Sequence, residues 1–256
     1  MKTLLSTSLF CLGLLSAVPP GRADDTLAQV IARIKPSVVG VGSVQKTRTP
    51  PMTFIGTGFV TDDGLSVLTC AHVIQKLLDA NPNEVIGILT GQGDTAQFRP
   101  ASVRAIDAEH DLALLRLSGA PLPALQLGDA ARVREGQALA FTGFPLGMLL
   151  GLHHVTHRAT GSSLTPVVMP SENAQRLDAK RLAQLQKSPY TVFQLDATAY
   201  PGSSGSPLFD PDTGIVYGIV NMVYVKGLKE SAISAPSGIT YAIPGHYMQA
   251  ILLKNK

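Results

Sequence analysis

Short segments rich in Val, Ile, Leu and Phe alternate with turns that contain Gly, Pro and Asp along most of this chain. Five such segments come first, at residues 37–44, 53–61, 66–69, 84–90 and 101–106, and five more follow, at 112–117, 138–142, 191–195, 215–225 and 239–243. Many short strands separated by turns are typical of an all-β barrel or sandwich. Because both halves share this texture, the pattern favours two β-barrels.

Helical patterns are confined to three places. Apolar residues at helical spacing over 27–34 predict a short amphipathic helix that Pro36 ends, and residues 246–253 are expected to form a closing helix. The polar stretch 169–188 interrupts the strands and is interpreted as a helical insertion. A solvated helix joining two strands is the favoured reading of this insertion, and a regulatory or substrate-gating loop is the alternative.

The first 23 residues have the features of an export signal. Lys2 supplies a charged start, residues 9–18 an apolar core, and residues 21–23 a small-residue cleavage site. The core is shorter than the roughly 20 apolar residues that span a bilayer. We therefore expect residues 1–23 to be a signal peptide, residues 24–256 to form one domain, and the product to be periplasmic or secreted without a membrane span.

The net charge and the cysteine content of the chain limit its expected partners and covalent bonds. The net charge of +3 falls towards neutrality without the leader, which does not favour nucleic acid as a partner. Cys70 is the one cysteine outside the leader, so no internal disulfide is expected. We interpret Cys70 as a small buried apolar residue rather than a nucleophile.

Three residues form a candidate catalytic set. Ser204 lies in a Gly- and Ser-rich turn, His72 ends an apolar run, and Asp111 opens an alternating strand. A serine hydroxyl needs a base to become a good nucleophile, and a carboxylate orients that base. The order His, Asp, Ser excludes the α/β-hydrolase and subtilisin arrangements and matches the chymotrypsin one.

In its sequence blocks the chain resembles trypsin-like (chymotrypsin-fold) serine peptidases, in particular the HtrA/Deg-like bacterial branch. The blocks are Gly56-Thr-Gly-Phe-Val, Leu68-Thr-Cys-Ala-His72, Asp111-Leu-Ala-Leu-Leu, Asp196-Ala, Gly202-Ser-Ser-Gly-Ser-Pro-Leu208 and Gly238-Ile-Thr-Tyr-Ala-Ile-Pro244. One departure is Ser206, where the family usually carries glycine. The resemblance implies two six-stranded antiparallel β-barrels, with His72 and Asp111 in the first and Ser204 in the second.

The resemblance also implies roles for individual residues. It makes His72, Asp111 and Ser204 the catalytic residues of a serine endopeptidase, with the backbone N–H groups of Gly202 and Ser204 forming the oxyanion hole. Ser203 is the weaker candidate for the nucleophile, because the family places the nucleophile directly before glycine. The residues after 253 leave no room for the PDZ domain that Deg-type proteases usually carry, so a stand-alone protease domain is expected.

Substrate recognition follows from the same resemblance. Thr198 is placed near the base of the primary pocket, and Asn221, Met222 and Val223 along one wall. None of these residues is acidic, so the chain is expected to cleave after small or apolar residues rather than after Arg or Lys. Peptides or unfolded proteins are the expected partners, and quality control or processing is the expected role. The sequence does not indicate an oligomeric state.

Two alternatives remain at this point. A catalytically weak relative could use the same cleft as a peptide-binding or chaperone module. His153, His154 and His157 invite a metal site, but no Cys, Asp or Glu lies near them in the sequence to complete a ligand set, so no metal and no other cofactor is expected. Ser203 stands where a zymogen switch of the digestive-enzyme kind needs an acid, which predicts that this switch is absent.

Overall fold

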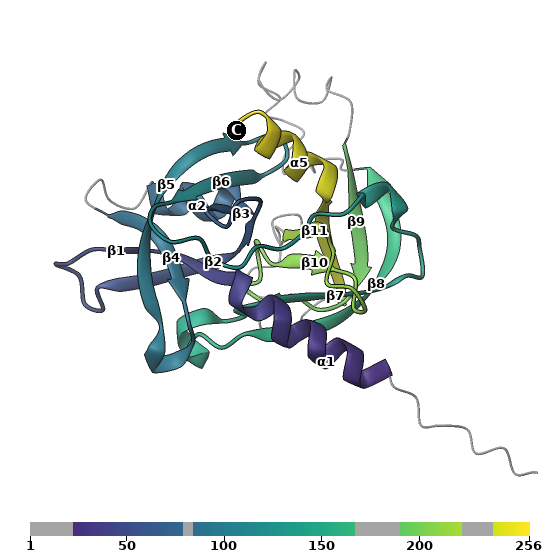
Figure 1. Cartoon of the computed structure of the whole chain (residues 1–256), viewed down its shortest axis with the longest axis horizontal. Coiled ribbons are helices and arrows are strands. Elements are labelled where there is room, and N and C mark those ends of the chain that lie inside the picture. Colours follow the sequence, from purple (N-terminus) through teal and green to yellow (C-terminus); the bar gives the residue numbers. More distant parts are fainter. Residues whose placement is uncertain (1–22, 79–83, 167–189, 222–237) are drawn as a thin grey trace, which may run out of the picture.

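The computed structural model describes residues 23–78, 84–166, 190–221 and 238–256, and two closed antiparallel barrels of six strands each make up most of it (Figure 1). The first barrel runs in the order β1 (Val38–Val44), β2 (Met52–Thr61), β3 (Ser66–Cys70), β6 (Leu112–Leu117), β5 (Gln97–Asp107) and β4 (Val85–Thr90). The second runs β10 (Pro207–Phe209), β11 (Val216–Asn221), β12 (Ile239–Pro244), β9 (Thr191–Asp196), β8 (Val155–Pro166) and β7 (Ala138–Gly143). This confirms the predicted fold class.

Three α-helices and four short 3-10 helices accompany the barrels in the described part of the chain. The α-helices are α1 (Ala23–Ile34), α2 (Ala71–Leu78) and α5 (Gly245–Leu253). The 3-10 helices are η1 (Lys35–Ser37), η2 (Gly93–Thr95), η3 (Ala130–Arg132) and η4 (Gly147–Leu150). The expected N-terminal and C-terminal helices are thus present, while α2 was not predicted. The predicted insertion at 169–188 and the last residues of the predicted strand 215–225 lie outside the described residues.

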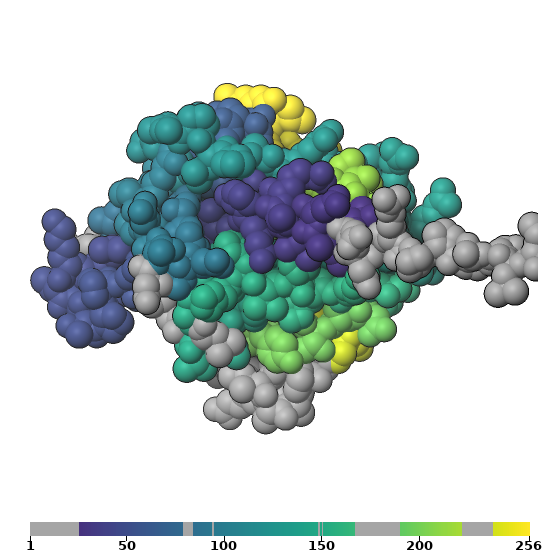
Figure 2. Space-filling model, turned by 60° about the horizontal axis from the view of Figure 1, so that its bottom comes forward, coloured from purple at the N-terminus to yellow at the C-terminus, as the bar shows by residue number. Residues whose placement is uncertain are grey.

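The N-terminal helix packs along the outside of the barrels. Leu27, Val30 and Ile34 are buried, as their spacing predicts for one face of a helix. Val30 and Ile34 approach the turn at Gly214, in the second half of the chain. In the space-filling view the purple N-terminal segment lies on the surface with residues of both barrels beside it (Figure 2).

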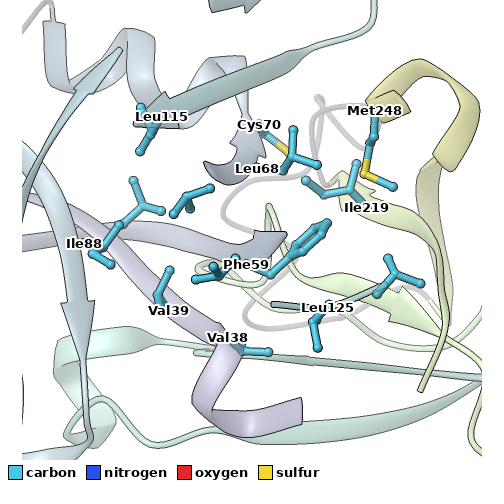
Figure 3. Packing of buried hydrophobic residues seen from close by; sticks show 14 of the residues in the cluster. Val38, Val39, Phe59, Leu68, Cys70, Ile88, Leu115, Leu125, Ile219 and Met248 are labelled. Atoms are coloured by element: carbon cyan, nitrogen blue, oxygen red, sulfur yellow. The ribbon is translucent and has the colours of Figure 1, made fainter. Parts of the chain in front are cut away.

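The largest apolar cluster is continuous from the first barrel into the second half of the chain. Figure 3 shows Leu68 and Phe59 of the first barrel near Ile219 of β11 and Met248 of α5, with Val38 at another part of the same cluster. A second cluster, which includes Phe141, Phe193 and Leu208, fills the second barrel. Because side chains of both halves share one core, burial of apolar surface holds the two barrels against each other.

None of the described helices is long and apolar enough to cross a lipid bilayer.

Candidate active site

Strand register brings His72 and Asp111 together. Strands β3 and β6 are antiparallel with Cys70 opposite Leu112, so the residue after Cys70 faces the residue before Leu112. The backbone N–H of Ala71 accordingly donates to the carbonyl oxygen of Asp111 at 2.9 Å. His72 is the next residue, in the first turn of α2. The end of one strand and the start of another therefore fix a histidine beside an aspartate 39 positions away.

Asp111 holds both the backbone and the ring of His72. Its Oδ1 accepts from the His72 backbone N–H at 2.7 Å, and its Oδ2 lies 2.6 Å from His72 Nδ1. Because an ionised carboxylate only accepts hydrogen bonds, Nδ1 carries the proton in this pair and Nε2 is left as the acceptor nitrogen. Asp111 adopts a left-handed backbone conformation with φ of 52°, which Asp tolerates better than most residues. The imidazole with its proton on Nδ1 and a free Nε2 is the tautomer that a general base requires.

A third hydrogen bond reaches Asp111 from the second barrel. The buried Asn221, at the end of β11, donates from Nδ2 to Asp111 Oδ2 at 2.8 Å. The sequence assigned Asn221 to the wall of the specificity pocket, whereas its amide group is directed at the carboxylate. Each oxygen of the half-buried carboxylate thus has a defined donor, which restrains its position.

The turn that carries Ser204 directs every one of its carbonyl groups at a donor. The carbonyls of Tyr200 and Ser203 accept from the N–H groups of Ser203 and Ser206, and that of Pro201 accepts from Leu146 N–H at 2.7 Å. The remaining two, of Gly202 and Ser204, accept from the hydroxyl and the backbone N–H of Thr57 at 2.7 and 2.8 Å. A turn held at each peptide has little freedom to rotate its N–H groups.

Two N–H groups of this turn lack an acceptor within the described part of the chain. Ser203 N–H donates to Tyr200 and Gly205 N–H to Val220, but those of Gly202 and Ser204 donate to no acceptor among the described residues. Ser204 is buried and Gly202 is half-buried. N–H groups in such places are usually paired, so two without a described acceptor in alternate peptides are unusual. They are suited to receive an oxyanion or the carbonyl oxygen of a ligand.

Glycine is required at two positions of the turn. Gly202 and Gly205 have φ of 98° and 92°, a region that side chains disfavour. A Cβ on Gly205 would lie 1.8 Å from the carbonyl oxygen of Thr57, and one on Gly202 would lie 2.4 Å from that of Phe144. The backbone of the turn can therefore lie in direct contact with the backbone of both barrels.

Close packing places the Ser204 turn beside the first turn of α2. A Cβ added to Gly56 would meet Val73, which follows His72, at 2.8 Å and the carbonyl oxygen of Ser204 at 3.1 Å. Ser204 is 6% exposed, and its hydroxyl makes no hydrogen bond with His72, although both residues are described. The structure thus brings Ser204 to the His72–Asp111 pair without joining the serine to the histidine.

Cys70 is a buried core residue, as the sequence predicted. Its side chain is fully buried, and Sγ lies 3.4 Å from the carbonyl oxygen of Val220. Burial, together with the nearby Asp111 charge, raises the pKa of the thiol well above its ordinary value. Cys70, His72 and Asp111 are the only group with metal-ligand spacing found among the described residues. Because a metal needs the thiolate, a thiol that stays protonated makes Cys70 a poor ligand.

We expect Cys70 to be inert in the folded protein. Ellman's reagent needs a thiolate and access to sulfur, and the native environment of Cys70 denies both. The thiol should react within minutes in 6 M guanidinium, yet show no reaction with the native protein on that timescale. Rapid labelling of the native protein at neutral pH would contradict this account of the site.

The three histidines near residue 155 form no metal-ligand group with Cys, Asp or Glu in the described residues. His154 Nε2 lies 2.9 Å from the carbonyl oxygen of Val38, and the ring of His157 stacks on Phe141. Burial lowers the pKa of both His154 and His157, which keeps them neutral near pH 7. Their contacts are those of half-buried residues packed against the barrels.

The structure describes only part of the predicted specificity pocket. Thr198 is partly exposed in the segment after β9, close to residues that line the second barrel. Met222 and Val223 lie outside the described residues. The specificity pocket therefore stays a prediction.

Known serine proteases are similar in sequence to most of this chain. The chain is 28% identical over 246 residues to mitochondrial serine protease HTRA2 of Drosophila willistoni, covering 93% of this chain and 48% of that protein. It is also 28% identical to human serine protease HTRA4, covering 94% of this chain and 44% of HTRA4. A probable periplasmic serine endoprotease, DegP-like, of Marinomonas sp. (strain MWYL1) is 29% identical over 77% of this chain and 34% of its own length.

Solved structures support the same fold. Deg5 matches with a TM-score of 0.63 at 21% identity, covering 91% of this chain and 93% of the Deg5 chain. The HtrA-type protease AlgW, solved with a tripeptide, also has a TM-score of 0.63 at 21% identity and covers 89% of this chain and 62% of the AlgW chain. The chain spans about half the length of the curated relatives that it matches over most of its own length.

The family model described as the trypsin-like peptidase domain matches residues 56–219, a segment that includes His72, Asp111 and Ser204. This match covers more than half of the chain and agrees with the two closed barrels and with the HtrA-type relatives. The chain belongs to the trypsin-like peptidase domain family.

Proposed function

We propose that this protein is a serine endopeptidase that hydrolyses peptide bonds through Ser204, His72 and Asp111. The observation that carries the proposal concerns the N–H groups of Gly202 and Ser204. No described residue accepts from them, although every carbonyl of the turn is hydrogen-bonded. Such a pair is suited to stabilise the negative oxygen of a tetrahedral intermediate. The nearby His72 carries its proton on Nδ1 against Asp111, which leaves a base on the other ring nitrogen.

The proposed reaction has two halves. His72 Nε2 takes the proton of Ser204 Oγ as this oxygen attacks the substrate carbonyl, and the oxyanion forms against the two free N–H groups. The protonated imidazole then gives its proton to the leaving amine, and an acyl-enzyme remains on Ser204. Water attacks the acyl-enzyme by the same route, with His72 again as base. Asp111 stays ionised and stabilises the imidazolium in both halves.

Burial favours Ser204 over Ser203 as the nucleophile. The side-chain oxygen of Ser203 is fully buried and has no hydrogen-bond partner in the part of the chain that the structure describes. An oxygen without solvent contact cannot reach a substrate carbonyl unless the turn rearranges. Ser206 Oγ is also buried without a partner, so it is no better placed.

The proposal extends to the location and substrates of the protein. We infer that residues 1–23 direct export, that residues 24–256 form the protease domain, and that this domain works in the periplasm or outside the cell. Its substrates would be peptides or unfolded proteins, in quality control or processing. The periplasmic DegP-like relative is consistent with this location.

One observation favours a second candidate, a catalytically weak peptide-binding module. The Ser204 hydroxyl and His72 share no hydrogen bond in this structure. Contacts of this kind are often loose without substrate and tighten in the complex. Incubation of the purified protein with a reduced, unfolded protein distinguishes the two candidates. Cleavage that is absent in the Ser204→Ala protein supports the peptidase, and binding without cleavage supports the module.

We expect cleavage to follow apolar residues such as Val, Leu or Ala. The residues that the resemblance assigns to the pocket, Thr198, Met222 and Val223, include no acid. Burying a substrate cation without a partner costs several kcal/mol, more than an added methylene contributes, so the preference over Arg and Lys should exceed about tenfold. A peptide library read by mass spectrometry measures this ratio, and a preference for Arg or Lys would refute the assigned pocket.

A further inference from the structure

The peptide groups of the Ser204 turn are held alternately by the two barrels. The carbonyls of Pro201 and Ser203 accept from Leu146 and Ser206, which belong to the second half of the chain. The carbonyls of Gly202 and Ser204 accept from the hydroxyl and the N–H of Thr57, on β2 of the first barrel. Among the described residues, Thr57 is the first-barrel residue that is hydrogen-bonded to this turn.

The hydroxyl of Thr57 has a defined orientation. It accepts from the backbone N–H of Phe144 at 3.1 Å, so its own proton is available for the Gly202 carbonyl at 2.7 Å. Phe144 leads into the segment whose Leu146 N–H holds the Pro201 carbonyl. One fully buried hydroxyl therefore connects the two second-barrel loops that border Gly202.

This connection supports the free N–H groups indirectly. They belong to the Pro201–Gly202 and Ser203–Ser204 peptides, whose carbonyls accept from the second half of the chain. Thr57 holds the peptide that follows each of them. In a trans peptide the carbonyl and the N–H point in opposite directions, so the orientation of each peptide group is fixed by its carbonyl contact. Gly202 has φ of 98°, and glycine has little intrinsic resistance to rotation of the peptides on either side. The contacts of its neighbours, rather than its own preference, must keep its N–H directed into the site.

We propose that Thr57 is a positioning residue for the oxyanion-binding turn and couples the first barrel to it. The inference rests on the proposed peptidase function and deepens it. The hydroxyl holds the peptide that follows Gly202, and the backbone N–H holds the peptide that follows Ser204. Loss of the hydroxyl leaves the Gly202 carbonyl without its donor, so that only the Ser203 N–H still holds this peptide, and it leaves the Phe144 N–H without its acceptor.

Thr57→Val tests the hydroxyl because valine has nearly the same shape and suits a strand. We expect kcat to fall about 10- to 100-fold, as for a displaced oxyanion donor, with KM within about threefold of the wild type. The loss falls on kcat because the oxyanion exists only in the transition state. The affinity for a peptide boronate, which forms a tetrahedral adduct, should fall in parallel with kcat/KM. Thr57→Ser, which keeps the hydroxyl, should restore kcat to within about threefold.

Thr61→Val is the matched control. Thr61 lies on the same strand, is equally buried, and donates its hydroxyl to the carbonyl oxygen of Leu125 at 3.0 Å, away from the turn. It should lose stability to a similar degree and keep its kcat. If Thr57→Val yields no folded protein, Thr57→Ala, which adds no atom, gives the same comparison.

The results of these experiments distinguish failure of the Thr57 positioning role from failure of the proposed peptidase function. An active wild type with equal kcat for Thr57→Val and Thr61→Val would overturn the positioning role alone, as would a Thr57→Ser protein as impaired as Thr57→Val. A wild type that cleaves no peptide and binds no boronate would overturn the proposed function, and the positioning role with it.

Discussion

Replacing Ser204 by alanine is expected to lower kcat for peptide hydrolysis by about 10⁴- to 10⁶-fold, because no other hydroxyl of the turn is placed to form the acyl-enzyme. His72→Ala should have an effect of the same order, since the hydroxyl then has no base. Asp111→Asn should cost about 10⁴-fold, because an amide can donate to Nδ1 and favour the wrong imidazole tautomer. Steady-state kinetics on one peptide substrate measures all three.

The combination of these variants is more informative than any one of them. Residues that act as a unit are strongly non-additive, so Ser204→Ala with His72→Ala should be no slower than Ser204→Ala alone. Urea unfolding of each variant controls for loss of structure. Near-normal turnover by a folded Ser204→Ala protein would refute the mechanism, and additive losses would show that the residues act separately.

Gly205→Ala is expected to produce the largest loss of stability among single-methyl changes at the site. The new Cβ would lie 1.8 Å from the carbonyl oxygen of Thr57, a backbone atom held by a Thr69 hydroxyl and unable to move aside cheaply. To this clash is added the cost of about 1 kcal/mol for a side chain at a φ of 92°. We expect a total loss of about 3 kcal/mol or more in the free energy of unfolding, and a fall in kcat of at least about 100-fold.

Gly136→Ala is the control that separates the backbone strain of a positive φ from the steric clash of a new Cβ. Gly136 has φ of 81°, and a Cβ there would meet no atom within 4 Å. It therefore carries the conformational cost alone, about 1 kcal/mol, and should leave kcat unchanged. Urea unfolding and peptide hydrolysis measure both variants. Equal destabilisation by the two would show that the turn can move away from Thr57, contrary to the packing described here.

The sequence predicted most of the fold because its strands follow local patterns. The runs that became β1, β2 and β6 are branched and apolar between Gly and Asp turns, so their burial is visible residue by residue. Strand β8 was missed because residues 155–166 are largely polar, and pairing with β7 and β9 holds them extended. Helix α2 was not predicted, because Val73, Ile74 and Leu77 have helical spacing over little more than one turn.

The candidate site was predictable only as far as its residue types carry chemistry. His72, Asp111 and Ser204 were identified by type, order and surrounding motif. Asn221 was assigned to the specificity pocket rather than to Asp111, and Thr57 was not identified, because their contacts with Asp111 and Gly202 join residues more than 100 positions apart. An amide and a hydroxyl in a strand have no local signature of such a contact. Only the barrel geometry reveals that both connect the first barrel to the second.

The central claim is that Ser204 is a nucleophile activated by His72. Labelling with a fluorophosphonate, followed by peptide mapping in a mass spectrometer, tests it most directly because the adduct stays on the attacking oxygen. The account predicts one adduct per chain, on Ser204, that is absent in Ser204→Ala and strongly slowed in His72→Ala. A folded wild-type protein that takes up no label, or takes it up on Ser203, would contradict the account.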